Sequence, residues 1–232
     1  MKEGDSTEEL TNELLEQLTC QTVFEIPIFG GIAVDEAVVV TWIIMAVLTV
    51  LSIVFVRNLK VENPGKLALE SVITWGSDFF EGIIGKSNRR YVPWLMTVAL
   101  YLAVANLIGL AGFKPPTKDL NVTAALAIMS MILIEYSGIH KNGLKHWCVH
   151  FAKPVPVVAP IMLMEIVIRP LSLCMRLFGN MLGGFVVMEL VKAVVPFLVP
   201  IPLSFYFDIF DGLLQAYVFV FLTALFMNEE ME

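Results

Sequence analysis

Charged residues are scarce in this 232-residue sequence, at 16% of the chain against 57% hydrophobic residues. The mean hydropathy of +0.78 lies well above the usual balance of a soluble globular protein. The formal net charge is −7, and much of it comes from six Asp or Glu residues ahead of position 17, so we expect no nucleic-acid surface. The composition predicts a polytopic membrane protein whose surroundings are the lipid bilayer.

Cysteine is rare as well, and the three cysteines, Cys20, Cys148 and Cys174, lack the spacing of a metal site. The sequence also lacks a Gly-rich phosphate loop, internal repeats, and any His, Cys or carboxylate set spaced to hold a metal. The residues ahead of the first apolar run are acidic rather than basic, which argues against a cleaved signal peptide. We therefore expect one domain with no structural disulfide, no metal and no other cofactor.

Apolar runs long enough to cross a hydrocarbon core of about 30 Å recur along the chain. Five such spans are expected, over residues 37–56, 91–113, 121–140, 157–194 and 203–227. The fourth is long for a vertical crossing and should be tilted. Residues 63–85 mix apolar and charged side chains and predict an interfacial amphipathic helix. The expected fold is an all-α polytopic membrane protein, with residues 1–36 as an extracytoplasmic acidic tail and 37–232 as a single membrane domain.

Lys and Arg residues predict the orientation of the chain, because loops rich in them face the cytoplasm. These residues crowd the connection between the first and second spans and the one between the third and fourth, whereas the N-terminal tail carries only Lys2. The N-terminus is therefore expected outside the cell and the C-terminus in the cytoplasm.

Arg176 lies within the apolar fourth span. A guanidinium near the centre of a membrane helix costs about 2.5–3.5 kcal/mol on insertion scales, and it cannot escape by losing its charge. Helical spacing places Arg176, Asn180 and Gly183 on one stripe, and Gly179 and Gly184 remove side-chain bulk beside it. The functional interpretation is a fixed positive charge that faces a carboxylate or an ion path. The alternative is an arginine that reaches to the membrane interface, beside glycines that pack two helices of this chain together.

The last span carries a second polar stripe, with Asp208, Asp211, Gly212 and Gln215 at spacings of three, four and seven residues. Two buried carboxylates and an amide on one face favour proton exchange near neutral pH. The alternative is an internal ion pair between Asp208 or Asp211 and Arg176 that neutralises both charges.

Other charged residues are open to more than one interpretation. Glu189 either joins Asp208 in a hydrated path that opens outside or pairs with Lys192. Asp119 either caps the helix of the third span or collects cations at a channel mouth. Arg169, near the basic cytoplasmic loop, is expected to extend to the membrane interface.

Four segments resemble the a subunit of bacterial F-type ATP synthases. They are RPLSLCMRLFGNM (residues 169–181), QAYVF (215–219), PPTKDLNVT (115–123) and ENPGK (62–66). The first contains Arg176 and is highly specific, and the similarity extends from about Asp35 to Met227.

This resemblance implies an ion-translocating stator subunit, non-catalytic on its own, whose last two spans form a long tilted hairpin against a ring of c subunits. Arg176 would meet the ring carboxylates between two offset half-channels, with Asn180 and Gln215 as polar companions. The implied partners are the c-ring and the b subunit of the peripheral stalk, in the bacterial cell membrane. Because the binding carboxylate belongs to the ring, the sequence leaves both H⁺ and Na⁺ open as the coupling ion.

The resemblance also assigns the remaining site residues. Asp119 is similar to the family's outer-channel carboxylate, and Asp208 falls where the family places a His or an acidic residue. The glycines at 179, 183 and 184 would form the surface that contacts the ring.

One residue departs from the family pattern: nine residues after the arginine the family often carries Glu or His, whereas this chain has Phe185. Glu189 and Asp211 are the candidates to replace that residue in the outer path. The alternative function is a stand-alone channel or secondary transporter with an intramembrane arginine, for which inverted repeats or broken half-helices would be the sign.

Overall fold

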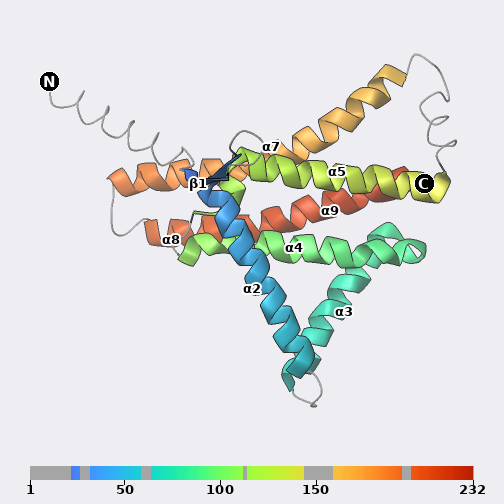
Figure 1. The fold of residues 1–232 in the computed structure, drawn as a ribbon, viewed down its shortest axis with the longest axis horizontal. Coiled ribbons are helices and arrows are strands. Elements are labelled where there is room, and N and C mark those ends of the chain that lie inside the picture. The colour runs from blue at the N-terminus through green and yellow to red at the C-terminus, as the bar shows by residue number, and fades with distance from the viewer. Residues whose placement is uncertain are drawn as a thin grey trace.

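A computed structural model describes residues 22–26, 32–58, 64–111, 114–143, 159–194 and 200–231. Long α-helices dominate the described part (Figure 1): α2 (Glu36–Asn58), α3 (Pro64–Ile84), α4 (Val92–Leu107), α5 (Leu120–Asn142), α7 (Ala159–Val194) and α9 (Gly212–Met231). The shorter helical elements are η1 (Lys86–Tyr91), η2 (Ile108–Ala111), η3 (Pro116–Lys118), α8 (Pro200–Ser204) and the π-helix η4 (Phe205–Asp211).

Five stretches of helix in the described residues are long and apolar enough to cross a membrane: Glu36–Val54, Asn88–Leu110, Leu120–Asn142, Met164–Lys192 and Pro202–Met231. They match the five expected spans closely, and the all-α polytopic fold is confirmed. A continuous helix is the natural solution in lipid, because each backbone N–H and C=O must find its partner within the segment. The 36-residue α7 would extend over about 54 Å, longer than a vertical crossing needs, as its sequence predicted.

A small antiparallel hairpin of β1 (Thr22–Ile26) and β2 (Ile32–Asp35) precedes α2. The sequence predicted only an acidic tail here, and a single hairpin is too small to change the fold class. Residues 1–21 of that tail lie outside the described residues. The division into an extracytoplasmic tail and one membrane domain stays a prediction.

The helix α9 lies at the centre of the bundle, where it packs against α4 and α5 and also contacts α3 and α7. Figure 1 shows α4, α5 and α9 running along the long axis of the molecule. The largest buried apolar side chains of the bundle are 2% exposed or less and include Leu95, Leu102, Ile134, Leu173, Leu177, Phe219 and Met227. Small residues such as Ala105, Ala216 and Ala224 let the helices approach closely, as is usual between membrane helices.

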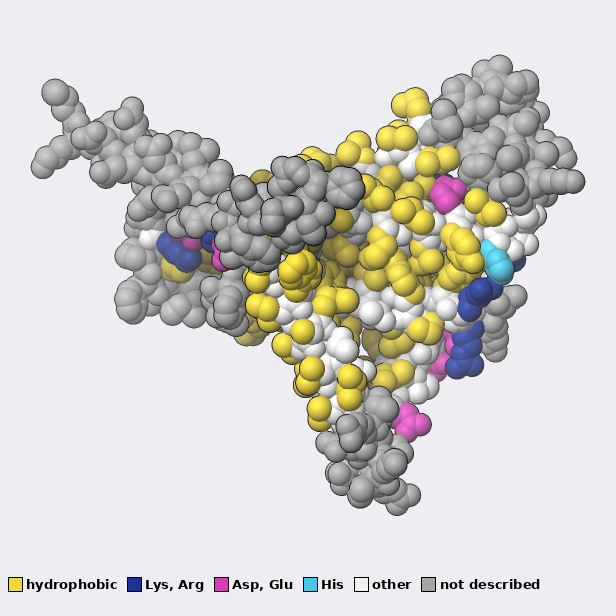
Figure 2. Space-filling view, viewed as in Figure 1, with side chains coloured by type: hydrophobic (Ala, Val, Ile, Leu, Met, Phe, Trp, Pro, Cys, Tyr) yellow, Lys and Arg dark blue, Asp and Glu magenta, His cyan; other side chains and the backbone are white. Residues whose placement is uncertain are grey.

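The outer surface of the bundle is largely apolar. Figure 2 shows hydrophobic side chains across the middle of one face, whereas the described charged side chains gather toward its two ends. On α2, side chains such as Trp42, Ile43 and Val50 are more than half exposed. Exposed apolar groups over the middle and charges at the ends are the surface that a bilayer requires.

The helix α3 covers the segment for which an amphipathic helix was expected. Phe80 and Ile84 are buried, and α3 contacts α4 and α9. Val72, Ile73 and Trp75 are nevertheless exposed, by 63%, 48% and 71%. The helix α3 therefore has apolar side chains on the face that packs against the bundle and also on its exposed face. Its location at the membrane interface stays a prediction.

Loops that the sequence placed on one side of the membrane meet at one end of the bundle. Arg90 Nη1 lies 2.6 Å from His140 Nε2, and Asn142 Nδ2 donates to the backbone oxygen of Glu230 at 3.3 Å. At the other end, Lys114 pairs with Glu36 at 3.4 Å. The alternation of the spans agrees with this arrangement, and which end faces the cytoplasm stays a prediction.

We expect Gly138→Ala to destabilise the protein. A Cβ atom at this buried position would lie 3.1 Å from the backbone oxygen of Glu230 and 3.3 Å from its Cβ. Overpacking of this kind costs about 1–3 kcal/mol, which outweighs the gain of about 1 kcal/mol from placing Ala instead of Gly in a helix. The control is Gly82→Ala, because nothing lies within 4 Å of that position. Thermal unfolding in detergent should give a lower midpoint for Gly138→Ala only, and equal midpoints would contradict the packing account.

Candidate functional site

Arg176 lies on the exposed face of α7, with Ser172, Met175 and Gly179 exposed beside it. Its guanidinium makes neither a hydrogen bond nor an ion pair to any residue that the structure describes. A permanent charge on an apolar surface of a membrane helix is costly unless something outside the chain compensates it.

Asn180 and Gln215, which the sequence predicted as polar companions of the arginine, are in contact. Asn180 Nδ2 donates to Gln215 Oε1 at 2.6 Å and so connects α7 with α9 one helical turn beyond Arg176. Gln215 is 1% exposed, and its Nε2 atom finds no acceptor among the described residues. A buried donor without a partner is costly, which is a sign of a functional site or of a bound water.

A cavity of about 580 Å³ opens next to Asn180, between the C-terminal half of α7, the η4 segment and the residues that follow η2. Asp211 and Glu189 both line it, as expected of candidates for an ion path. Glu189 is also paired with Lys192, with Nζ to Oε1 at 2.9 Å. The pairing is confirmed, and a part for Glu189 in an outward path stays a prediction. The structure thus brings Asn180, Asp211 and Glu189 to one cavity.

The π-helix η4 changes the second polar stripe. The sequence predicts a regular α-helix that presents Asp208, Asp211, Gly212 and Gln215 on one face. The wider turn of a π-helix changes the spacing between Asp208 and Asp211, whereas Gly212 and Gln215 follow in the regular helix α9. Turns of this kind occur often at functional sites. Asp211 is half-buried at the cavity, whereas Gly212 and Gln215 are buried in the bundle. The side chain of Asp208 lies outside the described residues, so a single stripe that includes it stays a prediction.

Asn106 holds the end of the π-helix in place. Its Nδ2 donates to the backbone oxygen of Gly212 at 2.8 Å, and its Oδ1 accepts from the Thr117 hydroxyl at 2.9 Å. Gly212 permits this approach, because a Cβ there would lie 3.1 Å from Asn106 Cβ. Sequence analysis missed Asn106 and Thr117. A single amide in the middle of an apolar span was the signal that would have found Asn106.

Phe185, the residue that departs from the family pattern, lines the cavity with its ring beneath Lys118. The Lys118 Nζ lies 3.0 Å from the ring centroid, and Lys118 is 9% exposed. A desolvated cation–π contact therefore stands where the resemblance suggested an acid or a histidine.

Asp119 caps the helix α5. Its Oδ1 accepts from the backbone N–H of Asn121 at 2.8 Å, and the residue is 6% exposed. Among the described residues, those that line the cavity do not include Asp119. The capping role is confirmed, and the role as a channel carboxylate stays a prediction.

The three glycines expected at a ring surface have different surroundings. No atom lies within 4 Å of a Cβ built at Gly179 or Gly183, and both residues are exposed beside Arg176. A Cβ at Gly184 would lie 3.2 Å from the Phe207 ring, and Gly184 lines the cavity. The structure therefore separates Gly184 from the open surface at Gly179 and Gly183.

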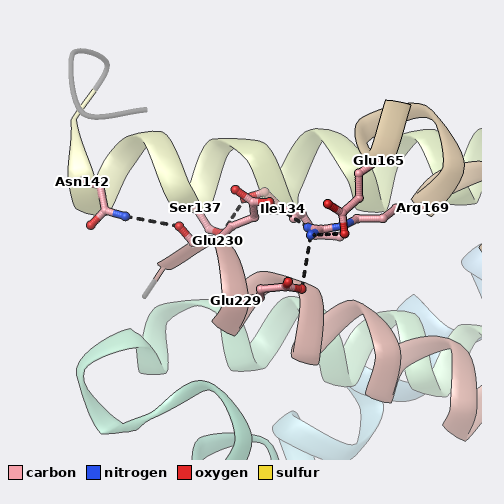
Figure 3. Close-up of polar contacts among 7 residues, drawn as sticks. All are labelled: Ile134, Ser137, Asn142, Glu165, Arg169, Glu229 and Glu230. Carbon is pink, nitrogen blue, oxygen red and sulfur yellow. Dashed lines mark hydrogen bonds and ion pairs between the residues drawn. The ribbon is translucent and has the colours of Figure 1, made fainter. Parts of the chain in front are cut away.

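Arg169 is buried in the protein, 8% exposed, and its position relative to the membrane interface stays a prediction. Three carboxylates hold its guanidinium (Figure 3): Glu230 at 2.7 Å, Glu165 at 3.0 Å and Glu229 at 3.2 Å. Glu229 and Glu230 lie at the end of α9. The sequence alone gave no indication that this end of α9 lies next to Arg169.

The described residues hold no group of three or more His, Cys, Asp or Glu that could bind a metal ion. Cys174 is a buried free thiol, 3.6 Å from the Thr123 hydroxyl. Cys20 and Cys148 lie outside the described residues.

Comparisons with known proteins agree with the resemblance seen in the motifs. A family model described as ATP synthase A chain matches residues 38–228. The ATP synthase subunit a of Moorella thermoacetica is 37% identical over 196 residues, which cover 84% of this chain and 89% of the relative. The ATP synthase subunit a 2 of a Bradyrhizobium species is 36% identical over 213 residues, 91% of this chain and 94% of the relative. The Geobacter sulfurreducens ATP synthase subunit a is 36% identical over 203 residues, 85% and 88% of the two chains.

We expect Asn106→Leu to destabilise the π-helical segment. Leucine fills a similar volume but leaves the Gly212 oxygen and the Thr117 hydroxyl without their buried partner, at a cost of about 1–3 kcal/mol. The midpoint of thermal unfolding in detergent should fall. Adding Thr117→Val should lower it by less than the sum of the two single effects.

The matched control is Thr97→Val, also on α4, because the Thr97 hydroxyl bonds only to Pro93 of its own helix and is exposed. An effect of Asn106→Leu no larger than that of Thr97→Val would contradict the assigned role.

Proposed function

The chain belongs to the ATP synthase A chain family, and on this premise we propose that it is the ion-translocating stator subunit a of a bacterial F-type ATP synthase. It catalyses no reaction alone. It passes ions between the two sides of the cell membrane and the ring of c subunits, and the ion flow drives the rotation that supports ATP synthesis. The observation that carries this proposal is the exposed, unneutralised Arg176 on an apolar face of α7.

The partner that Arg176 meets is a carboxylate of the ring. A carboxylate that crosses lipid must be neutral, through a bound proton or Na⁺. Next to a fixed guanidinium its charged form is favoured, so that the ion leaves on one side and is replaced from the other. The open surface at Gly179 and Gly183 gives the ring helix room to approach Arg176.

The cavity beside Asn180 supports an outer half-channel. Its carboxylates are Asp211 and Glu189, and Asn180, which lines it four residues after Arg176, donates to Gln215. With the N-terminus outside, this cavity opens to the outside of the cell. Asp208 and Asp119 belong to the same outer path by their positions in the family pattern.

The second half-channel opens on the cytoplasmic side of Arg176, offset from the first. Arg176 prevents a direct leak between the two, because a cation does not easily pass a fixed cation. The membrane potential then supplies about 2.3 kcal/mol per elementary charge per 100 mV. The b subunit of the peripheral stalk holds the chain against the turning ring.

Arg176→Ala is expected to abolish ATP-driven ion pumping, because the ring carboxylate loses the charge that releases its ion. The measurement is the acidification of inverted membrane vesicles on addition of ATP, with and without Na⁺. The control is Arg89→Ala, since Arg89 is exposed and pairs with Glu81 at the end of the bundle. Normal pumping by Arg176→Ala would refute the proposed function and favour a scaffold that conducts no ions.

The outer path is tested by Asp211→Asn, Glu189→Gln and Asp208→Asn, which keep the shape of each side chain and remove its charge. Proton-transfer groups typically contribute on the order of 10²-fold or more, so we expect a large loss of pumping for Asp211→Asn. The smaller loss is expected for Glu189→Gln, because Lys192 already neutralises Glu189. The control is Asp78→Asn, an exposed residue of α3. Any of the three that pumps as fast as the control has no part in the path.

A further inference from the structure

Two side-chain connections between α7 and α9 lie on either side of Arg176. Asn180, four residues after the arginine, donates to Gln215 at 2.6 Å. Arg169, seven residues before it, donates to Glu230 at 2.7 Å. At 1.5 Å per residue, the connections lie about 6 Å and about 10 Å from Arg176 along the helix. The segment of α7 that carries Arg176 is therefore held to α9 at both ends.

The connection at Arg169 is stronger than a surface ion pair. The guanidinium is 9% exposed and divides its nitrogens among carboxylates, with Nη1 on Glu230 and Nη2 on both Glu165 and Glu229. The planar fork of arginine suits such a shared arrangement, and desolvation strengthens charge-assisted hydrogen bonds. The Arg169 Cζ also lies 5.1 Å from the centroid of the Phe226 ring. Figure 3 shows the carboxylates converging on the guanidinium from two helices.

The position of Glu229 and Glu230 on their helix is electrostatically unfavourable for carboxylates. They occupy the last turn of α9, next to its C-terminus, where the negative end of the helix dipole opposes carboxylates. Arg169 supplies the positive charge that compensates both. Glu230 is the more enclosed partner, with its side chain 24% exposed against 60% for Glu229.

Glu230 is itself fixed from a third helix. Asn142 Nδ2 donates to its backbone oxygen, and Gly138 of α5 allows the Glu230 backbone to come within 3.1 Å of where a Cβ would stand. The carboxylate that holds Arg169 thus sits on a rigid contact between α5 and α9.

Arg169 precedes the weakest point of the backbone of α7. Pro170 lies inside this helix and has no N–H, so the carbonyl of Ile166 lacks its usual helical hydrogen bond. A helix bends most readily at such a proline. The ion pairs of Arg169 therefore act where the helix would otherwise change its angle, six residues from Arg176.

We propose that Arg169 and Glu230 form a positioning clamp that sets the height and rotation of Arg176 against the ring. The clamp rests on the proposed function of Arg176. Arg169 is a positioning residue that touches no transported ion, and the end of α9 becomes part of the translocation machinery through it. A displacement of about 1 Å in a catalytic group can cost on the order of 10²-fold in rate, so a loose clamp lowers pumping without removing any group of the ion path.

The test compares Arg169→Gln, Arg169→Lys and Glu230→Gln with the single charge reversals Arg169→Glu and Glu230→Arg and with the exchange that combines these two reversals, all in the full ATP synthase. The measurement is ATP-driven ion pumping in vesicles, divided by the ATP hydrolysed and by the amount of this chain in the membrane. The control pair is Arg89→Gln and Glu81→Gln, which removes an ion pair of similar length, 2.7 Å, outside the contact of α7 with α9.

We expect Arg169→Gln and Glu230→Gln to lower pumping per assembled complex by about tenfold or more, and Arg169→Lys to keep part of it because an ammonium reaches one carboxylate at a time. The exchange should restore pumping above both single charge reversals. A role in folding alone would reduce the amount of the chain and leave pumping per complex unchanged. If the Arg169→Gln variant fails to assemble, Arg169→Lys and Glu230→Gln still test the clamp, because their pumping is also divided by the ATP hydrolysed and by the amount of the chain in the membrane.

Normal pumping per complex in Arg169→Lys and Glu230→Gln, or no recovery in the exchange, would overturn the clamp. Arg176→Ala is measured in the same series. If it also pumps normally, the proposed function itself fails; if it is inactive while the clamp variants pump normally, only the clamp is refuted.

Discussion

A guanidinium that cannot lose its charge, placed on an apolar helix surface, is the constraint on which the rest of the structure depends. Arg176 has no compensating group among the described residues of its own chain. In the proposed function, Arg176 must lie at a fixed position relative to its partner carboxylate. The attraction between the two charges, which offsets the cost of a charge in lipid, weakens as their separation increases. The side-chain contacts on either side of Arg176 join neighbouring helices to each other, and both of them join α7 to α9.

The helix α9 supplies most of this support. It contacts α3, α4, α5 and α7, and it carries the partners of both residues that hold α7, Gln215 and Glu230. The helix begins directly after the π-helix, where Asn106 binds the Gly212 oxygen and the preceding residue, Asp211, lines the cavity. One central helix thus follows directly on the cavity residue Asp211 and carries both Gln215 and Glu230, the residues that bind α7.

Phe185 replaces the acid or histidine that the family pattern suggested, and it lines the cavity beside Asn180. The phenyl ring holds the ammonium of Lys118, and the cavity beside it receives carboxylates from other positions, Asp211 and Glu189. The carboxylates at the cavity thus come from positions other than 185. A motif comparison detects the missing acid, whereas the shape of the cavity identifies the carboxylates that line it instead.

The five spans and the stripe of Arg176, Asn180 and Gly183 were predictable from sequence, because they depend on hydrophobic runs and helical period. The motif marked Asn180 and Gln215 as polar companions of Arg176, and the structure added that the two amides bond to each other. The π-helix was not predictable, since the local sequence has no feature that distinguishes it from a regular α-helical turn.

The sequence by itself determined that the chain is a membrane protein with Arg176 inside an apolar helix, because composition and period act locally along the chain. Only the tertiary structure decided what surrounds Arg169, which the sequence placed at the membrane interface and which is buried among three carboxylates. Two of those carboxylates come from residues some sixty positions away, Glu229 and Glu230. Contacts between distant segments depend on how helices pack, and no local pattern records them.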